Sequence, residues 1–258
     1  MIRHTAVIAE MASAHDGAIG KAFRLIDAAA EAGADFVKAE FWSDANRLAD
    51  RRRVPEQFRA HYQRYQVPRS WLQPLQEHAT ARGVGFLCST YLTQDITLVA
   101  PLVPMFKVSG FEVQDRAFLE AHEPFGKPVI ASVPLSVPVP EPLSVLTLFL
   151  HVVQAYPANA SDLHLAMIRA HGLIGFSDHS GDTHAGADAV LAGAAIVEAH
   201  IKLMDTDPNN YDAGRHAHAP AAFARYVANI RRAEDKLGGT LKGQATCEAE
   251  CRQYRVKA

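Results

Sequence analysis

The stretch GFSDHSGDTHAGADAVLAGAAIVEAHI, residues 175–201, is the most informative about the architecture of this chain. It continues an apolar run that starts at Leu173. A polar loop, a small-residue segment of helical character over Thr183–Ala192 and a second apolar run, Ala195–Val197, then follow. Strand, loop, helix and strand in that order form the repeating unit of a parallel α/β sheet. The stretch therefore predicts two neighbouring parallel strands joined by a helical crossover.

Two histidines stand at the ends of these strands. The first run stops at Ser177-Asp178-His179-Ser180, and the second stops at Glu198 and His200. The C-terminal ends of parallel strands meet at one edge, where α/β barrels carry their chemistry, so we expect His179 and His200 to lie close together. Imidazole is the commonest metal-ligating side chain, and the pair predicts a divalent metal site. The alternative is that a chain with 13 His places two near strand ends without any role.

Length, composition and charge limit the class of protein. The 258 residues could form one α/β barrel or two small domains, and 48% apolar residues suffice for a large core. A formal net charge of -2 gives no attraction to nucleic acid or to a membrane surface. The apolar run before Glu10 is too short for a signal peptide or a membrane span, so we expect a cytoplasmic protein.

The three cysteines, Cys88, Cys247 and Cys251, are expected to be reduced thiols, because nothing in the sequence indicates secretion. Cys247 and Cys251 lie four residues apart in a polar segment. We interpret them as surface thiols rather than metal ligands, since a closed zinc site needs four ligands.

The alternation of strands and helices continues along the chain. Apolar runs predict eight strands, at Thr5–Ile8, Phe36–Phe41, Val84–Tyr91, Met105–Gly110, Lys127–Val133, Leu146–Val153, Leu173–Phe176 and Ala195–Val197. Helical periodicity predicts helices near residues 17–32, 68–82, 94–100, 114–122, 162–170 (with Ser161 as N-cap), 183–192 and 220–237. The polar segment 42–67 stays unassigned. This pattern over residues 1–240 predicts a TIM (β/α)8 barrel, followed by a C-terminal tail over residues 241–258.

One crossover departs from the regular pattern. Between the fifth and sixth predicted strands stands PLSVPVPEP, residues 134–142. Proline lacks the backbone donor that a helix needs, so the fifth helix should be reduced or missing. We expect a gap in the outer ring of helices there. A second copy of the chain could cover that gap, which favours a homodimer.

Polar side chains stand at or just after the end of every predicted strand. They are Glu10, Lys38 with Glu40, Ser89-Thr90, Lys107 with Ser109, Ser132, Gln154 with Tyr156, Ser177-Asp178-His179, and Glu198 with His200. Ammonium groups and hydroxyls suit a phosphorylated or carboxylated anion. Imidazoles beside carboxylates suit a metal that acts as a Lewis acid on a carbonyl. The sequence thus predicts a metal-assisted reaction on an anionic, carbonyl-bearing metabolite.

These motifs together resemble one family of enzymes. They are Ile8-Ala9-Glu10, His15-Asp16-Gly17, Ala32–Lys38, Ser89-Thr90, Phe106-Lys107, Gly126-Lys127-Pro128, Tyr156-Pro157, Gly175–His179, Leu191–Ala194, Glu198-Ala199-His200 and Pro220. In this order they cover almost the whole chain. The sequence resembles the sialic acid synthase family, which includes the N-acetylneuraminate, legionaminate and pseudaminate synthases and spore-coat polysaccharide relatives.

The resemblance implies a reaction between two small molecules. Phosphoenolpyruvate would condense with an open-chain sugar aldehyde similar to N-acetylmannosamine, giving a 2-keto-3-deoxy sugar acid. Phosphate would leave by C–O cleavage. A divalent ion, Mn²⁺ or Mg²⁺, would be held by His179 and His200 and would polarise the aldehyde.

The resemblance also implies roles for individual residues. Glu10, Lys38, Lys107, His179 and His200 would form the catalytic set. Phosphoenolpyruvate would be bound by Lys38, Thr90, Lys107, Ser132 and Ser177. The second substrate would be bound by Glu10, Glu40, Gln154, Tyr156 and Asp212, and Ser109 and Glu112 are further expected substrate-binding residues. Asp178 and Glu198 would orient the rings of the two histidines.

The chain departs from the family pattern at several places. Glu40 stands where the family usually has Gln, and Gln154 stands where it has Asn. The phosphate-binding serine is displaced by one position to Ser109, so on a regular strand it would point to the other face. The Ser-Thr-Gly after the fifth strand becomes Ser132-Val133-Pro134.

The chain given also stops at Ala258, before the family's C-terminal antifreeze-like domain. We therefore expect either a separate antifreeze-like protein as a partner or a different electrophile. Two alternatives stay open: the same phosphoenolpyruvate chemistry on another aldehyde, and a non-catalytic barrel subunit that partners a synthase. Retention of Lys38, Lys107, His179 and His200 favours an enzyme.

Overall fold

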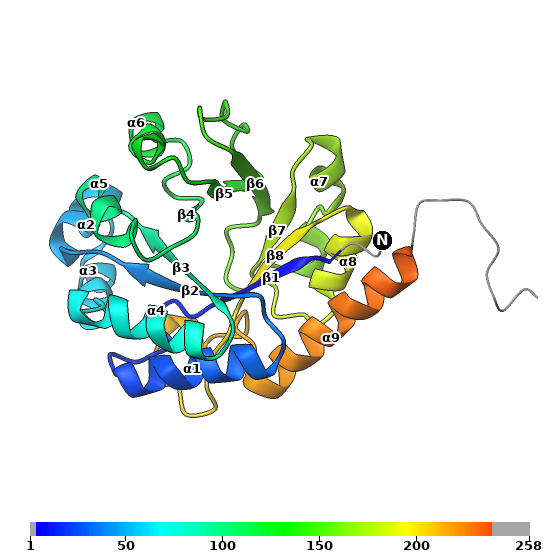
Figure 1. Ribbon diagram of the computed structural model, residues 1–258, viewed down its shortest axis with the longest axis horizontal. Coiled ribbons are helices and arrows are strands. Elements are labelled where there is room, and N and C mark those ends of the chain that lie inside the picture. Colours follow the sequence, from blue (N-terminus) through cyan, green and yellow to red (C-terminus); the bar gives the residue numbers. More distant parts are fainter. Residues whose placement is uncertain (1–3, 239–258) are drawn as a thin grey trace, which may run out of the picture.

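The computed structural model describes residues 4–238 and contains a closed barrel of eight parallel strands. The strands pair in chain order, and β1 closes the ring against β8 (Figure 1). They are β1 (Ala6–Glu10), β2 (Phe36–Phe41), β3 (Gly85–Thr90), β4 (Phe106–Val108), β5 (Val129–Pro134), β6 (Thr147–Val152), β7 (Gly175–Asp178) and β8 (Ile196–His200). The predicted TIM barrel is confirmed.

The interior of the barrel is built in two layers. Ile8, Leu87, Ile130, Leu150 and Ile196 pack together as an apolar layer inside the ring. Successive side chains on a strand point to opposite faces, so the residue two positions further along faces inward again. In the second layer four of these five positions are polar (Glu10, Ser89, Ser132 and Glu198), and the fifth is Val152. Lys38 and Lys107 lie at the same level. The outward-facing residues form the main core against the helices.

The outer helices mostly follow the predicted segments. They are α1 (Ile19–Glu31), α4 (Leu72–Ala81), α5 (Thr93–Val99), α6 (Arg116–Glu120), α7 (Ala166–Ala170), α8 (Ala185–Ala192) and α9 (Pro220–Leu237). Helix α1 buries Ala22, Leu25, Ile26 and Ala29, as its apolar stripe predicts.

Two local expectations need correction. The unassigned segment 42–67 holds two helices, α2 (Ala45–Arg52) and α3 (Glu56–Arg64), and the Asp44 side chain caps α2. The helix expected over 162–170 is only α7, and Ser161 lies in a short 3-10 turn, η3 (Ala160–Asp162), so it is not the predicted N-cap. The remaining 3-10 turns are η1 (Arg69–Trp71), η2 (Glu123–Phe125) and η4 (Tyr211–Ala213).

The β5–β6 crossover has no helix in the structure, as its prolines predict. Figure 1 shows this part of the chain as an extended loop beside α6. Cys88 is buried in β3, whereas Cys247, Cys251 and the expected tail 241–258 lie outside the described residues. Among the helices of residues 4–238, none is both long and apolar enough to cross a membrane.

Candidate active site

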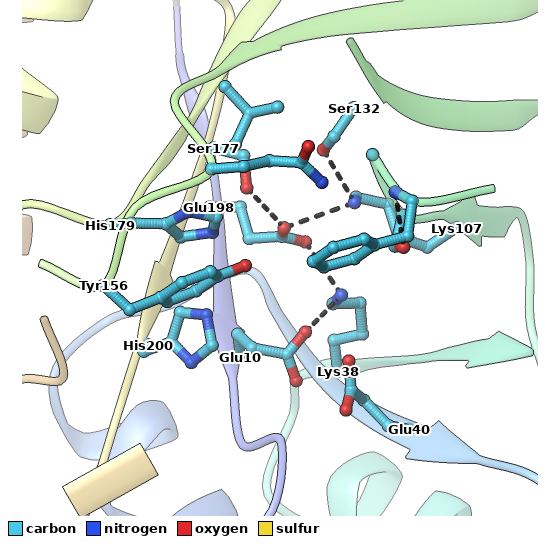
Figure 2. A pocket seen from close by; sticks show the side chains of 15 residues that line it. Glu10, Lys38, Glu40, Lys107, Ser132, Tyr156, Ser177, His179, Glu198 and His200 are labelled. Carbon is cyan, nitrogen blue, oxygen red and sulfur yellow. Dashed lines mark hydrogen bonds and ion pairs between the residues drawn. The ribbon is translucent and has the colours of Figure 1, made fainter. Parts of the chain in front are cut away.

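The polar layer opens into a cavity at the C-terminal mouth of the barrel. Side chains from seven of the eight strands or the loops that follow them line the cavity (Figure 2). Its lining includes the predicted residues Glu10, Lys38, Glu40, Lys107, Ser109, Ser132, Gln154, Tyr156, Ser177, His179 and His200. These residues lie far apart in the sequence, and closure of the barrel brings them to one place.

Two buried ammonium groups face each other across Glu198. Lys38 Nζ contacts the Glu10 carboxylate and donates to Ser89 Oγ at 3.1 Å. Lys107 Nζ donates to Ser132 Oγ at 2.9 Å. The Glu198 carboxylate lies 3.4 Å from Lys38 Nζ and 3.3 Å from Lys107 Nζ. The sequence interpretation of Glu198 as an orienting group for histidine is therefore wrong: alternation on β8 points it inward, toward the lysines.

Burial and neighbouring charges set the protonation of this cluster. Burial alone would lower the pKa of Lys38, but Glu10 and Glu198 outweigh that effect and hold it above the usual range. Burial lowers the pKa of Lys107. For Glu198, burial is opposed by Lys107 and Lys38, which hold its pKa below the usual range. Burial raises the pKa of Glu10 to about 7, although Lys38 opposes the shift.

The two predicted histidines do lie beside each other. The ring centroids of His179 and His200 are 5.3 Å apart, and Tyr156 stacks on His179 at 4.2 Å. Nδ1 of His179 lies 2.9 Å from the carbonyl oxygen of Val153, which suits donation and leaves Nε2 as a free lone pair. Asp178 does not orient His179, because its carboxylate accepts from Tyr226 Oη at 3.0 Å and from the Ser180 amide.

A third imidazole, missed by the sequence analysis, adjoins His200. His216 lies in the loop after β8, and its ring centroid is 4.9 Å from that of His200. Asp212 Oδ1 lies 3.3 Å from His200 Nδ1 and 3.4 Å from His216 Nε2. The three residues can each offer one ligand atom, and these atoms lie within 4.8 Å of one another. The donor set of imidazoles and a carboxylate therefore fits a divalent metal.

The histidines differ in protonation. Burial, with His200 nearby, lowers the pKa of His179 well below its usual value. Burial also opposes protonation of His200, but Asp212 more than offsets it and raises the pKa of His200. The Asp212 carboxyl has a pKa well below the usual range, because His200, His216 and Ser13 outweigh the effect of burial.

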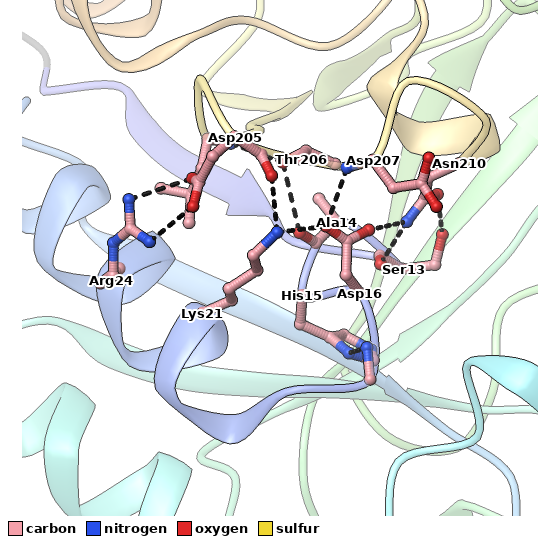
Figure 3. A network of polar contacts seen from close by, with 12 residues as sticks. Ser13, Ala14, His15, Asp16, Lys21, Arg24, Asp205, Thr206, Asp207 and Asn210 are labelled. Atoms are coloured by element: carbon pink, nitrogen blue, oxygen red, sulfur yellow. Dashed lines mark hydrogen bonds and ion pairs between the residues drawn. The ribbon is translucent and has the colours of Figure 1, made fainter.

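Hydrogen bonds between distant segments fix the loop that carries Asp212. Asp212 Oδ2 accepts from the Ser13 amide at 3.0 Å and from the Ser13 hydroxyl. Asn210 donates to Ser13 O at 2.7 Å and to Asp16 Oδ1 at 2.8 Å. Lys21 joins Asp16 to the carbonyl oxygen of Asp205 (Figure 3). This network joins the β1–α1 loop to the β8–α9 loop and holds Asp212 in place.

Some predicted site residues lie elsewhere. Thr90 is the last residue of β3 and is buried, but it does not line the cavity. Glu112 is also buried outside it, where Arg52 pairs with its carboxylate at 2.8 and 3.0 Å. Asp212 lies behind His200 rather than on the cavity wall.

Ser109 lines the cavity, although its hydroxyl bonds to Glu112 outside it. Strand β4 ends at Val108, and the two-residue alternation no longer governs the position after it. Ser109 Oγ donates to Glu112 and so connects the cavity wall to the buried Arg52–Glu112 pair.

The family model that matches this chain and its curated relatives agree with one another. The model of the NeuB family matches residues 25–242. N-acetylneuraminate-9-phosphate synthase of Mus musculus is 27% identical over an alignment that covers 98% of this chain and 76% of that protein. The spore coat polysaccharide biosynthesis protein SpsE of Bacillus subtilis is 29% identical, over 97% of this chain and 77% of its own length.

Solved structures give the same fold. The N-acetylneuraminic acid synthetase of Leptospira borgpetersenii superposes with a TM-score of 0.85 at 21% identity, covering 98% of this chain and 92% of that one. A truncated 3-deoxy-D-arabino-heptulosonate 7-phosphate synthase of Thermotoga maritima superposes with a TM-score of 0.68 at 11% identity, over 92% of this chain and 88% of that one.

Proposed function

Because this chain belongs to the NeuB family, we propose that it condenses phosphoenolpyruvate with a sugar aldehyde. The methylene carbon of phosphoenolpyruvate would bond to the aldehyde carbon, water would add to the carbon that bears the phosphate, and phosphate would leave by C–O cleavage. The product is a 2-keto-3-deoxy sugar acid. The observation that carries the proposal is the convergence of Lys38, Lys107, His179, His200 and Glu10 on one cavity.

Phosphoenolpyruvate would be held by the lysine side of the cavity. Lys38 and Lys107 supply two positive charges, which Glu198 between them and Glu10 beside Lys38 partly offset. Ser132 and Ser177 add hydroxyl donors on the same wall. Because the ammonium groups are nearly fully buried, their attraction to a phosphate or carboxylate is screened less by water than at the surface.

Glu10, which contacts Lys38, would accept or donate the proton in the reaction. Its pKa of about 7, raised by burial, suits a group that accepts a proton from the attacking water or returns one to the new hydroxyl. Tyr156, stacked on His179, would cover the aldehyde from the open side of the cavity.

A divalent ion, Mn²⁺ or Mg²⁺, fits beside His200. The Nε2 lone pair of His179 is available because Nδ1 bonds to Val153. When bound, the ion would supply a Lewis acid that polarises the aldehyde carbonyl.

Membership of the family also supports proposals about the oligomeric state, the location and the partners of the protein. We infer a homodimer that acts in the cytoplasm on small molecules. A separate antifreeze-like protein could complete the sugar site. The two relatives described above are named for sugar-acid or polysaccharide biosynthesis, which supports the substrate class.

The proposed function is tested by phosphate release. Purified protein is given phosphoenolpyruvate with a panel of hexosamines and simple aldoses, with and without Mn²⁺ or Mg²⁺. We expect aldehyde-dependent phosphate release that stops with EDTA and falls by about 100-fold or more in His200→Ala. The exposed His184→Ala is the matched control and should keep full activity.

The bond that breaks can be checked directly. Phosphoenolpyruvate labelled with ¹⁸O at the bridging oxygen should give labelled phosphate if the C–O bond is cleaved. No phosphate release with any aldehyde, together with no phosphoenolpyruvate binding by calorimetry, would refute the catalytic role and favour the non-catalytic subunit.

A further inference from the structure

We propose that Arg52 is a positioning residue for the aldehyde side of the cavity. Its guanidinium lies behind the cavity wall and holds two residues of that wall, Ser109 and Glu40, through their partners. The inference rests on the proposed function, because it assigns this wall to the aldehyde. Arg52 belongs to α2, in the polar segment 42–67 that the sequence pattern does not assign.

The first contact of Arg52 is a buried ion pair with Glu112. Nε and Nη2 of the guanidinium donate to the two carboxylate oxygens at 2.8 and 3.0 Å. Two parallel hydrogen bonds fix the orientation of a carboxylate as well as its position. The Arg52 side chain is 15% exposed and that of Glu112 is 2% exposed, so water competes little with the pair.

Glu112 in turn fixes the chain that follows β4. Its carboxylate accepts from the Ser109 hydroxyl, and its amide donates to the Ser109 carbonyl oxygen at 3.1 Å. The Phe111 amide donates to Ser109 Oγ at 3.2 Å. This turn is tightly packed, because a Cβ at Gly110 would lie 2.9 Å from Gln154 Nε2. A displaced Glu112 would therefore move a turn that lines the cavity beside Gln154.

The second set of contacts is aromatic. The guanidinium carbon of Arg52 lies 4.5 Å from the ring centroid of Tyr91 and 4.8 Å from that of Phe111. A guanidinium over an aromatic face is attracted by the ring electrons. The buried Tyr91 donates its hydroxyl to the Glu40 carboxylate, and Phe111 lines the cavity. One guanidinium thus supports Glu40 through Tyr91 and the Ser109 turn through Glu112.

The lysine side of the cavity has supports of its own. The two ammonium groups proposed to bind phosphoenolpyruvate contact Ser89, Ser132 and Glu198. In the described part of the chain, the Arg52 side chain donates its hydrogen bonds to Glu112 and Tyr62. Loss of Arg52 should therefore impair aldehyde binding far more than phosphoenolpyruvate binding. General loosening of the barrel would affect both substrates.

Steady-state kinetics of phosphate release by the full chain measures this difference. Arg52→Met keeps a long apolar stem but cannot pair with Glu112. We expect the KM for the aldehyde to rise about tenfold, while the KM for phosphoenolpyruvate stays within about twofold. Arg52→Lys keeps the charge without the two parallel hydrogen bonds, so it should restore part of the loss.

Arg51→Met is the matched control on the same helix. Arg51 pairs with Asp115 at 2.6 Å, and its guanidinium carbon lies 5.0 Å from the ring centroid of Phe118. It therefore makes the same two kinds of contact, but with α6 and its N-cap instead of the cavity wall. Both KM values should stay within about twofold of the wild type.

A double variant separates position from buried charge. Arg52→Met alone leaves the Glu112 carboxylate buried without its cation, which should lower stability in urea. Adding Glu112→Gln removes that charge and should restore stability, yet the KM for the aldehyde should stay raised. If the single variant does not fold, the double variant takes its place in every measurement.

A readout without turnover tests the wall independently of the reaction. 4-Fluorophenylalanine placed at Phe111 reports the surroundings of that ring by ¹⁹F nuclear magnetic resonance in the full chain. Arg52→Met should shift the resonance, because the ring loses the guanidinium beside it. Arg51→Met should leave the resonance unchanged.

An unchanged aldehyde KM in Arg52→Met would overturn the proposal. Equal rises in both KM values, or the same effects in Arg51→Met, would overturn it as well. If the wild type releases no phosphate with any aldehyde, the proposed function fails. The fluorine resonance then decides separately: a shift in Arg52→Met upholds the positioning of the wall, and an unchanged resonance refutes it.

Discussion

At the scale of single residues, the position of a side chain along its strand decides whether it faces the inside of the barrel or the outer helices. On β8, the side chains of Ile196, Glu198 and His200 all face the inside of the barrel. Ile196 belongs to the apolar layer, Glu198 contacts Lys38, and His200 lines the cavity as a proposed metal ligand. The residues between them, Val197 and Ala199, pack outward into the main core. A shift of one residue would bury Glu198 among the helices, where it would have no cation.

Glu40 is the residue from which we expect substrate selection. Its carboxylate lines the cavity and accepts a hydrogen bond from Tyr91 Oη. On the proposed function, this charge should favour an aldehyde that carries a free amine. Glu40→Gln keeps an oxygen for Tyr91 but removes the charge. The ratio of kcat/KM for mannosamine over N-acetylmannosamine should fall by about tenfold. An unchanged ratio would contradict this role.

Among the structural elements, the loop between β1 and α1 depends on a neutral histidine. His15 is buried beside Tyr65 and Trp71, and its Nδ1 accepts from the Gly17 amide at 3.0 Å. Burial lowers the pKa of His15 to about 4, although Asp16 and Asp212 oppose the shift. The same loop carries Ser13, so its conformation determines how firmly Asp212 is held.

The low pKa of His15 predicts a pH-dependent stability. The unfolded chain binds this proton with a pKa near 6.5 and the folded chain with a pKa of about 4. Stability is therefore full above pH 6.5 and falls as the pH drops toward 4, by up to about 3 kcal/mol. His15→Asn offers an acceptor that does not titrate. Urea unfolding at pH 7, 5.5 and 4.5 should give a shallower loss for the variant, and equal slopes would contradict the prediction.

In the molecule as a whole, the ring of helices is open at one side. The β5–β6 crossover contains no helix, and Leu135, Val139 and Leu146 on it are 40%, 37% and 61% exposed. Exposed apolar side chains that gather on one face commonly mark an interface. This arrangement supports the homodimer inferred above, with the crossover in the interface.

Sedimentation velocity tests the dimer. The wild type should sediment with twice the 28.1 kDa mass of one chain. Leu146→Glu places a charge on the crossover and should shift the protein to the monomer. Leu191→Glu changes a leucine of α8 that is 45% exposed, and it should leave the dimer intact. A monomeric wild type, or dissociation by both variants alike, would contradict the prediction.

Local sequence patterns were enough to predict the barrel and most of the cavity. Parallel strands joined by helical crossovers bring their C-terminal ends to one edge, so linear position was enough to place Glu10, Lys38, Lys107, His179 and His200 together. The prolines after β5 likewise indicated where the outer helix is missing, because they remove backbone donors locally.

The partners of those residues, by contrast, depend on how the chain closes in three dimensions. Glu198 meets Lys38 and Lys107 through closure of the ring, and no local pattern indicates that contact. The loop with Asp212 and His216 has no helical or strand period. Its shape comes from bonds to Ser13, about 200 residues away in the chain. The sequence signal for His216 was the pair of histidines in His216-Ala217-His218. Which of the two reaches Asp212 depends on packing, because one contacts Asp212 and the other contacts Tyr226.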